Sequence, residues 1–363
     1  MTVPTPAGNA ELSGQEAAEE VLLRAHRSGR LPHAWLLTGP RGIGKATLAY
    51  RFARFLLAQG KRAEAADEDL FGAPAPAASE LAVAAESPVF RKVAQGAHPD
   101  LRLLARSPDP KSGKMRSGIV VDDVRAAEGF LRRTSAEGGW RIVICDPADE
   151  LNPNAANALL KVLEEPPAQA VLLLVSHAPD RLLPTIRSRC CRLPLRPLAE
   201  DRVIELLGRY APETEAGDRV ALARLSEGSI GRALDLAEGG LALYRELVAV
   251  LADLPRLDVG RTYAFGDRLG ARGAGQDAFR IGMELLAWWL ARMIRGGAEG
   301  RLPAEAVAGE AALMERLLAG ASLEQWLALW EKITRLGARA ERVNLDRRQV
   351  VVTALLEFEG LAA

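Results

Sequence analysis

The chain has 363 residues, of which 48% are apolar and 26% are charged, the balance of a soluble globular protein. A chain of this length exceeds one ordinary hydrophobic core, so we expect two or three domains. Lysine and arginine together equal aspartate and glutamate in number. This equality excludes a global positive field that draws the chain to nucleic acid, and any DNA contact must be local or shared with partners.

Cysteine usage and the lack of long apolar segments indicate the compartment. The three cysteines, Cys145, Cys190 and Cys191, have no metal-ligand spacing, which predicts a reducing compartment and no structural zinc. Residues 1–20 contain no basic start and no apolar core of signal-peptide length, and no segment approaches a membrane span. We therefore expect a cytoplasmic protein without membrane contact.

The first part of the chain alternates strand-like and helical segments. A helical pattern over 14–28 leads to the apolar run at 34–38, which is short enough for a buried strand. A glycine-rich loop and an amphipathic helix follow this run. Further strand-like runs, separated by helical segments, occur at 101–105, 141–146 and 170–176. This alternation predicts an α/β fold with a parallel sheet covered by helices on both faces.

The other segments give the predicted domain boundaries. Residues 61–88 are rich in Ala, Glu and Pro without a sustained period, so we interpret them as an insertion or flexible linker, in which 79–86 could form a short helix. Further along the chain the strand signals fade into helices divided by Gly and Pro. We predict a phosphate-binding domain over 1–197, a small helical domain over 198–240 and a second helical domain over 241–363.

The stretch GPRGIGKAT has the glycines and the lysine of a phosphate-binding loop. Gly39, Gly42 and Gly44 let backbone N–H groups converge on phosphate oxygens. The helix that follows adds positive potential at its N-terminus, and Lys45 reaches the outer phosphates. The alternative is a simple glycine turn before a helix. The apolar strand before the loop favours the phosphate-binding interpretation.

Two groups that ATP hydrolysis needs are missing near this loop. Ala46 stands where the loop requires a hydroxyl to hold magnesium, and Thr47 could partly replace that hydroxyl only if the loop shifted. Asp146 ends an apolar strand, as the fold requires, but Pro147 follows it in place of the glutamate that polarises water. Glu150 is a conceivable but displaced substitute. The residues are compatible with ATP or ADP bound without hydrolysis, and they leave open whether nucleotide binds.

A helix is predicted to follow Asp146. Asn152 suits its N-cap and Pro153 its first position, while the two glutamates at its other end, Glu164 and Glu165, are interpreted as solvated. Ser176 ends the next strand, where it could sense a terminal phosphate or simply form a turn.

Several motifs resemble those of a known family. LPHAWLLTGPRGIGKAT, AHPDL, RIVICD, AANALLKVLEEPP and LLPTIRSRC occur in the order found in the bacterial DNA polymerase III clamp-loader subunits, densely from about residue 14 to 195. The resemblance implies a P-loop NTPase (AAA+) domain, a helical lid domain and a C-terminal helical collar domain. It also implies a pentamer with gamma/tau and delta subunits that opens the sliding clamp and loads it onto primed DNA, so that clamp and primer-template DNA are contacted through the complex.

Within this family the chain resembles the delta-prime type, the non-motor subunit with a degenerate site. Ala46, Pro147 and Gly231 stand where the gamma/tau motor carries the magnesium hydroxyl, the acid and a phosphate-sensing arginine. Relatives often hold zinc with four cysteines before the HPD motif. Because 61–96 contains no cysteine, the Ala-rich insertion appears in place of the zinc module and no zinc is expected.

The family's Ser-Arg-Cys motif is present at 188–190. In related loaders its arginine reaches the ATP of the neighbouring subunit, so the resemblance implies that Arg189 is an arginine finger acting in trans. Arg187 and Arg192 are the rival candidates. Without the resemblance, Arg189 is a surface charge that pairs with a surface acid.

Two other functions compete with this one. An autonomous ATPase of the gamma/tau type requires a hydroxyl after Lys45 and an acid after Asp146, and both are missing. A small-molecule kinase needs a substrate pocket with its own acid or arginine set, and a DNA-dependent helicase needs a strongly basic track. Neither feature is visible, because the basic stretch 102–116 is better explained as a solvated loop.

Overall fold

The computed structural model describes residues 3–67, 80–270, 275–343 and 345–362. The chain separates into two compact units. Unit 1 comprises residues 1–202 with 228–231, and unit 2 comprises residues 203–227 with 232–363. The finer three-domain boundaries expected from the sequence stay predictions.

Unit 1 contains a five-stranded sheet in the order β2-β3-β4-β1-β5, in which every pair of neighbouring strands is parallel. Its strands are β1 (Ala34–Thr38), β2 (Leu101–Leu104), β3 (Arg141–Cys145), β4 (Ala170–Ser176) and β5 (Cys191–Pro194). All residues of β1, β3 and β4 are buried, as expected for strands covered on both faces. The predicted α/β fold with a parallel sheet is confirmed.

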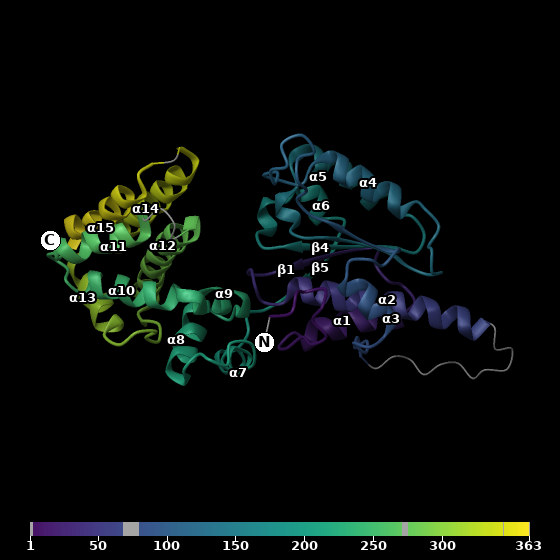
Figure 1. Cartoon of the computed structure of the whole chain (residues 1–363), viewed down its shortest axis with the longest axis horizontal. Helices are drawn as coiled ribbons and strands as arrows, with labels where there is room; N and C mark the ends of the chain where they lie inside the picture. The colour runs from purple at the N-terminus through teal and green to yellow at the C-terminus, as the bar shows by residue number, and fades with distance from the viewer. Residues whose placement is uncertain (1–2, 68–79, 271–274, 344, 363) are drawn as a thin grey trace. The chain divides into compact units, whose positions relative to one another are not determined.

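Helices cover both faces of this sheet (Figure 1). One face carries α1 (Glu16–Arg27), α2 (Lys45–Asp67) and α3 (Pro88–Ala94), and the other carries α4 (Val121–Leu131), α5 (Pro153–Glu164) and α6 (Pro184–Arg187). Successive residues of β1 alternate between the two cores. Trp35 and Leu37 pack with α1, α2 and α3, whereas Ala34 and Leu36 pack with α4 and α5. The chain therefore places its strand ends, and the loops that follow them, on a rigid two-sided core.

The stretch interpreted as an insertion differs in part from that expectation. Helix α2 continues to Asp67, into the predicted linker. Residues 68–79 lie outside the described residues, and 80–86 form no helix. Ser87 then caps α3, because its hydroxyl accepts a hydrogen bond from the Phe90 amide at 3.1 Å.

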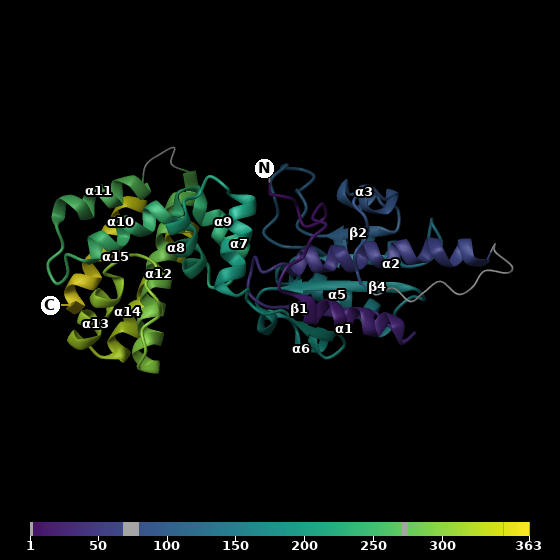
Figure 2. The same cartoon turned by 90° about the horizontal axis from the view of Figure 1, so that it is seen from below.

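In the described residues, unit 2 contains helices and no strand (Figure 2). The helices that follow β5 are α7 (Glu200–Tyr210), α8 (Ala216–Ser226), α9 (Ile230–Asp235), the π-helical turn η3 (Leu236–Gly240), α10 (Leu241–Leu251), α11 (Val259–Gly270), α12 (Gly275–Glu299), α13 (Glu310–Gly320), α14 (Leu323–Val343) and α15 (Arg347–Ala362). Phe358 packs against Trp289 and Trp326, with ring centroids 6.3 and 6.1 Å away, and all three side chains are fully buried. In the part of the chain that the structure describes, no helix has the length and apolar composition needed to cross a bilayer.

A buried ion pair joins two helices of unit 2. Glu310 at the start of α13 is 1% exposed, and its carboxylate accepts a hydrogen bond from Arg292 of α12 at 2.6 Å. The Tyr244 hydroxyl donates to the same oxygen, and the Ala306 amide donates to the other oxygen at 2.8 Å. These hydrogen bonds offset the free-energy cost of burying the carboxylate charge. Loss of a donor would therefore leave that cost uncompensated.

We predict that Arg292→Met destabilises the protein by about 3–5 kcal/mol, because it leaves the Glu310 carboxylate buried without its cation. Arg295→Met is the matched control on the same helix. Arg295 pairs with Glu227 at 2.7 Å, but both side chains are largely exposed, so its loss is expected to change stability by less than about 1 kcal/mol. Guanidinium unfolding followed by circular dichroism measures both. Equal stabilities of the two variants would contradict the prediction.

Candidate functional site

The phosphate-binding loop follows β1 and needs its glycines for the backbone that it adopts. Gly39, Gly42 and Gly44 have φ values of 142°, 78° and 99°, a region that favours glycine. A Cβ atom on Gly39 would also lie 2.7 Å from the Leu195 carbonyl oxygen. The glycines that the sequence singles out therefore have the role in backbone geometry that a phosphate loop requires.

The carbonyl oxygens of this loop are held by hydrogen bonds from several parts of unit 1. Lys45 Nζ donates to the carbonyl of Gly39 at 2.6 Å and to that of Pro40. Ser229 Oγ donates to the Arg41 carbonyl at 2.7 Å, and the Gly231 amide donates to the Gly42 carbonyl at 3.0 Å. Gln15 Nε2 donates to the Ile43 carbonyl at 3.1 Å. Among the described residues, the amides of Gly42, Ile43 and Gly44 donate no such bond. A loop with its carbonyls fixed and its amides unused is suited to an anion.

Gly231 packs directly on the phosphate loop. A Cβ atom at this position would lie 2.9 Å from the Gly42 Cα atom, which is closer than side chains approach a backbone. The position at which the family resemblance expects an arginine in the motor subunit is therefore occupied by backbone in contact with the loop. A side chain cannot be restored here without moving the loop.

Lys45 and Asp146 lie close enough for their charges to influence each other. Lys45 is 2% exposed, and burial lowers the pKa of its amine to about 8, while the charges of Asp146 and Asp149 act in the opposite direction. Burial raises the pKa of the Asp146 carboxyl, and Lys45 opposes this shift. Thr47, in the first turn of α2, is 8% exposed. The structure thus brings together the predicted lysine and acid of a nucleotide site.

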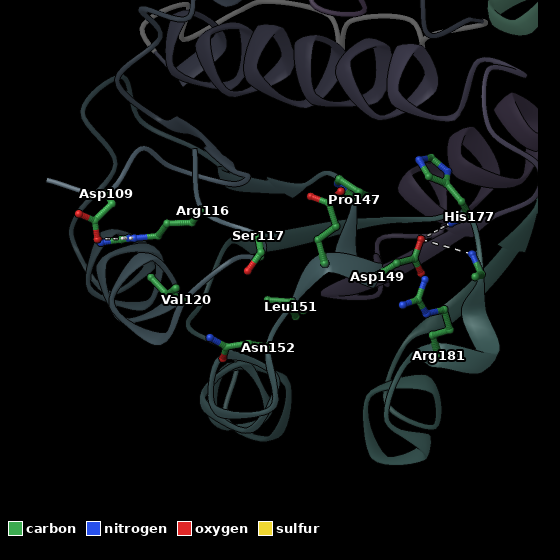
Figure 3. A pocket seen from close by; sticks show the side chains of 13 residues that line it. Asp109, Arg116, Ser117, Val120, Pro147, Asp149, Leu151, Asn152, His177 and Arg181 are labelled. Atoms are coloured by element: carbon green, nitrogen blue, oxygen red, sulfur yellow. Dashed lines mark hydrogen bonds and ion pairs between the residues drawn. The ribbon is translucent and has the colours of Figure 1, made fainter. Parts of the chain in front are cut away.

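Asp149, which the sequence did not single out, joins the turn after β3 to the end of β4 (Figure 3). Its carboxylate accepts hydrogen bonds from Ser176 Oγ at 2.6 Å, the His177 amide at 2.5 Å and the Ala178 amide at 3.3 Å. Ser176 is completely buried, and its hydroxyl is used by Asp149. Phosphate sensing by Ser176 therefore requires this bond to break. An acid placed one turn beyond a buried strand was the available signal for Asp149.

The acids near Asp146 do not restore a general base. Glu150 makes an ion pair with Arg106, with 2.7 Å between the carboxylate and Nε, and the position after Asp146 is Pro147. Burial lowers the pKa of His177 to about 4, so its ring is neutral at pH 7. With a pKa of about 4 the His177 ring is a weak base, and Glu150 is held by Arg106, so neither is well suited to the water-polarising role.

A pocket of about 790 Å³ lies beside these acids. Figure 3 shows Asp149, His177 and Arg181 together in this pocket, and Asp109 with Arg116 away from them. The full lining consists of Asp109, Arg116, Ser117, Gly118, Val120, Pro147, Asp149, Glu150, Leu151, Asn152, His177, Ala178 and Arg181. No residue of the phosphate loop lines it, so the pocket adjoins the predicted nucleotide site and does not contain it.

Arg189 lies after α6, and no described contact joins it to Lys45 or Asp146. Its Nη2 atom is 2.9 Å from a carboxylate oxygen of Glu164, and its Nη1 donates to the Thr185 carbonyl at 3.1 Å. Its side chain remains 36% exposed. The pair with a surface acid, expected as the simple alternative, is therefore present, and the trans role stays a prediction.

The two rival arginines differ in their contacts. Arg187 pairs with Asp180 at 2.8 Å, whereas no partner of the Arg192 side chain occurs among the described residues.

The cysteines are unsuited to metal binding. Burial raises the pKa of Cys145 and raises that of Cys190 to about 12, which disfavours the thiolate that zinc requires. In the residues that the structure describes, no group of His, Cys, Asp and Glu could hold a metal ion. The expectation of no zinc stays a prediction.

Comparison with known proteins identifies the family. The family model described as "DNA polymerase III, delta subunit" matches residues 14–199, more than half of the chain. The chain belongs to the DNA polymerase III delta subunit family. Similar members include DNA polymerase III subunit delta' of Pseudomonas aeruginosa, 41% identical over 54% of this chain and 53% of that protein. The protein of the same name from Escherichia coli K12 is 35% identical over 61% of this chain and 59% of that protein.

The similarity extends to a second kind of polymerase subunit. DNA polymerase III subunit gamma/tau of Mycobacterium bovis is 33% identical over 57% of this chain and 32% of that protein. The chain spans little more than half the length of the delta' relatives that it matches. The family is therefore established for the region that holds the sheet of unit 1, and identity alone does not separate the two subunit types.

For this member of the DNA polymerase III delta subunit family, we predict that Gly231→Ala destabilises unit 1. The added Cβ atom collides with the Gly42 backbone, and such overpacking costs about 1–3 kcal/mol. Gly129→Ala is the control, because Gly129 lies inside α4 with open space around it and alanine there is expected to be neutral or stabilising by up to about 1 kcal/mol. Unfolding by urea measures both, and equal effects would refute the packing role of Gly231.

Proposed function

We propose that the chain is a non-motor, delta-prime-type subunit of the DNA polymerase III clamp loader. In this role it joins gamma/tau and delta subunits and helps to load the sliding clamp onto primed DNA during replication, contacting clamp and DNA through the complex. The observation that carries the proposal is a phosphate loop that has its glycines and Lys45 in place, while Ala46, Pro147 and Gly231 occupy the positions of the groups that hydrolysis needs. The names of the relatives from P. aeruginosa and E. coli support it.

The alternative is an autonomous ATPase of the gamma/tau type, and the similarity to the M. bovis gamma/tau subunit supports this alternative. Hydrolysis needs a base within hydrogen-bond reach of the attacking water. Glu150, the candidate substitute for the base, is held by Arg106 at 2.7 Å. Ser176, the candidate phosphate sensor, is held by Asp149 at 2.6 Å. These contacts favour the non-motor role.

In the proposed role, Arg189 reaches the ATP of the neighbouring gamma/tau subunit. Phosphoryl transfer builds negative charge on the terminal phosphate oxygens, and a guanidinium placed there stabilises it without losing its proton. The Arg189 side chain is 36% exposed, so a neighbour can meet it. Such a finger supplied in trans increases the rate of hydrolysis by a factor of about 10³ to 10⁵. A subunit can then lose its own hydrolysis and still be required for hydrolysis next to it.

We predict that a clamp loader assembled with Arg189→Ala shows DNA-stimulated ATP hydrolysis at least about tenfold slower than the unmodified loader, because the ATP site next to this subunit lacks its finger. The measurement is steady-state ATP turnover together with clamp loading on primed DNA. Arg187→Ala is the control, because Arg187 lies two residues away, also pairs with an acid (Asp180, at 2.8 Å) and is a rival candidate for the finger. An Arg189→Ala complex that assembles and works at the unmodified rate would overturn the trans role.

We also propose that the phosphate loop binds ATP or ADP without hydrolysing it. The unused amides of Gly42 and Gly44 support binding, and the missing hydroxyl at Ala46 and base at Pro147 oppose turnover. Because burial lowers the pKa of Lys45 to about 8, the amine is positive below that pH and neutral above it. Its attraction for phosphate is therefore present at pH 7 and is lost as the pH rises through about 8.

The expected result is that the isolated chain binds ATP at pH 7, more weakly at pH 9, and shows no turnover at either pH. Lys45→Met is expected to abolish binding at pH 7 and to remove the pH dependence. Isothermal titration at the two pH values measures binding, and phosphate release measures turnover. Turnover that Lys45→Met abolishes would favour the gamma/tau-type ATPase, and no ATP binding at pH 7 would refute this second proposal.

A further inference from the structure

Arg189 is held between a carboxylate and a backbone carbonyl of unit 1. Glu164 lies 2.9 Å from Nη2, and the Thr185 carbonyl accepts from Nη1 at 3.1 Å. The two acceptors come from different elements, the end of α5 and the short helix α6. They bind opposite nitrogens of one planar group, which restricts rotation of the guanidinium more than a single contact does.

Glu164 occupies a position that is unfavourable for an acid. It is the last residue of α5, where the carbonyl groups of the helix end create negative potential. A negative carboxylate in this negative potential is destabilising unless a cation lies beside it. The guanidinium of Arg189 supplies the cation, so the pairing compensates for the placement of Glu164.

The adjacent Glu165 provides a contrast. It is also exposed at the end of α5, and its carboxylate makes no ion pair among the described residues. Glu164 and Glu165 both lie at the end of α5 and are both exposed to solvent, but only Glu164 contacts Arg189. This difference separates the effect of charge at the helix end from the effect of the specific contact.

We propose that Glu164 is a positioning residue for Arg189 and holds the guanidinium ready for the phosphate of the neighbouring subunit. The proposal rests on the trans role of Arg189 proposed above. A guanidinium has five N–H donors, and the two contacts leave further donors for phosphate oxygens. Because the side chain is already held, less rotamer freedom is lost when it meets the transition state. Glu164 acts through Arg189 and does not touch the nucleotide.

The experiment uses the assembled clamp loader with primed DNA and the sliding clamp, and measures kcat and KM for ATP. Glu164→Ala is expected to lower kcat about 3- to 30-fold with little change in KM; the upper bound corresponds to the rotamer freedom of one arginine. Glu164→Gln is expected to lose less, because its amide oxygen still accepts a hydrogen bond. Glu165→Ala, the matched control, is expected to leave kcat unchanged.

A double variant distinguishes positioning from a general structural effect. In the Arg189→Ala background, Glu164→Ala is expected to produce no further loss of kcat, because its effect passes through Arg189. If Glu164→Ala prevents assembly, Glu164→Asp replaces it, since the shortened side chain withdraws the carboxylate and is expected to lower kcat as well.

The outcomes separate this proposal from the proposed function. If Arg189→Ala lowers kcat but Glu164→Ala and Glu164→Asp do not, the positioning role is wrong and the finger role stands. If Arg189→Ala itself has no effect, the trans role fails and the positioning role fails with it. An equal loss of kcat in Glu164→Ala and Glu165→Ala would also overturn the proposal, because it would reflect the charge of the helix end alone.

Discussion

The carboxylate of Asp149 is the contact on which the geometry of the site depends. It ties the turn after β3 to the end of β4 through the Ser176 hydroxyl and the amides of His177 and Ala178. Since β4 lies between β3 and β1 in the parallel sheet, the carboxyl ends of all three strands meet at one edge, where ligands of such sheets bind. The backbone ladder already pairs β3 with β4, and this acid additionally fixes the turn after β3 against the residues that follow β4.

In our proposal, the chain keeps the backbone framework of a nucleotide site around this edge but lacks the groups needed for hydrolysis. The loop glycines adopt positive φ values, and Lys45 and Asp146 remain within electrostatic reach. The loop carbonyls are held by donors from Gln15, Ser229 and Gly231. In contrast, Pro147 follows Asp146 where a base is needed. A fold preserved in this way is consistent with a scaffold that offers a surface group, Arg189, to another subunit.

The strongly apolar strands and the capped helix were predictable from sequence. Strands β1 and β4 have the predicted bounds, and α5 begins at Pro153 because the Asn152 side chain accepts from the Ala155 amide at 2.8 Å. The edge strand β5 was missed, since most of its residues are exposed and no apolar run announces it. Partner choice was not predictable either. Asp149 and Glu164 owe their roles to residues that are distant in sequence, and local patterns carry no information on such contacts.

The placement of Arg189 in the assembled complex tests the account most directly. A structure of the loader determined by electron microscopy, with gamma/tau subunits and a slowly hydrolysed ATP analogue, would locate its guanidinium. The account predicts direct hydrogen bonds from Arg189 to the terminal phosphate held by the adjacent subunit, with Glu164 still beside it. A structure in which Arg189 faces solvent while Arg187 or Arg192 contacts that phosphate would contradict it.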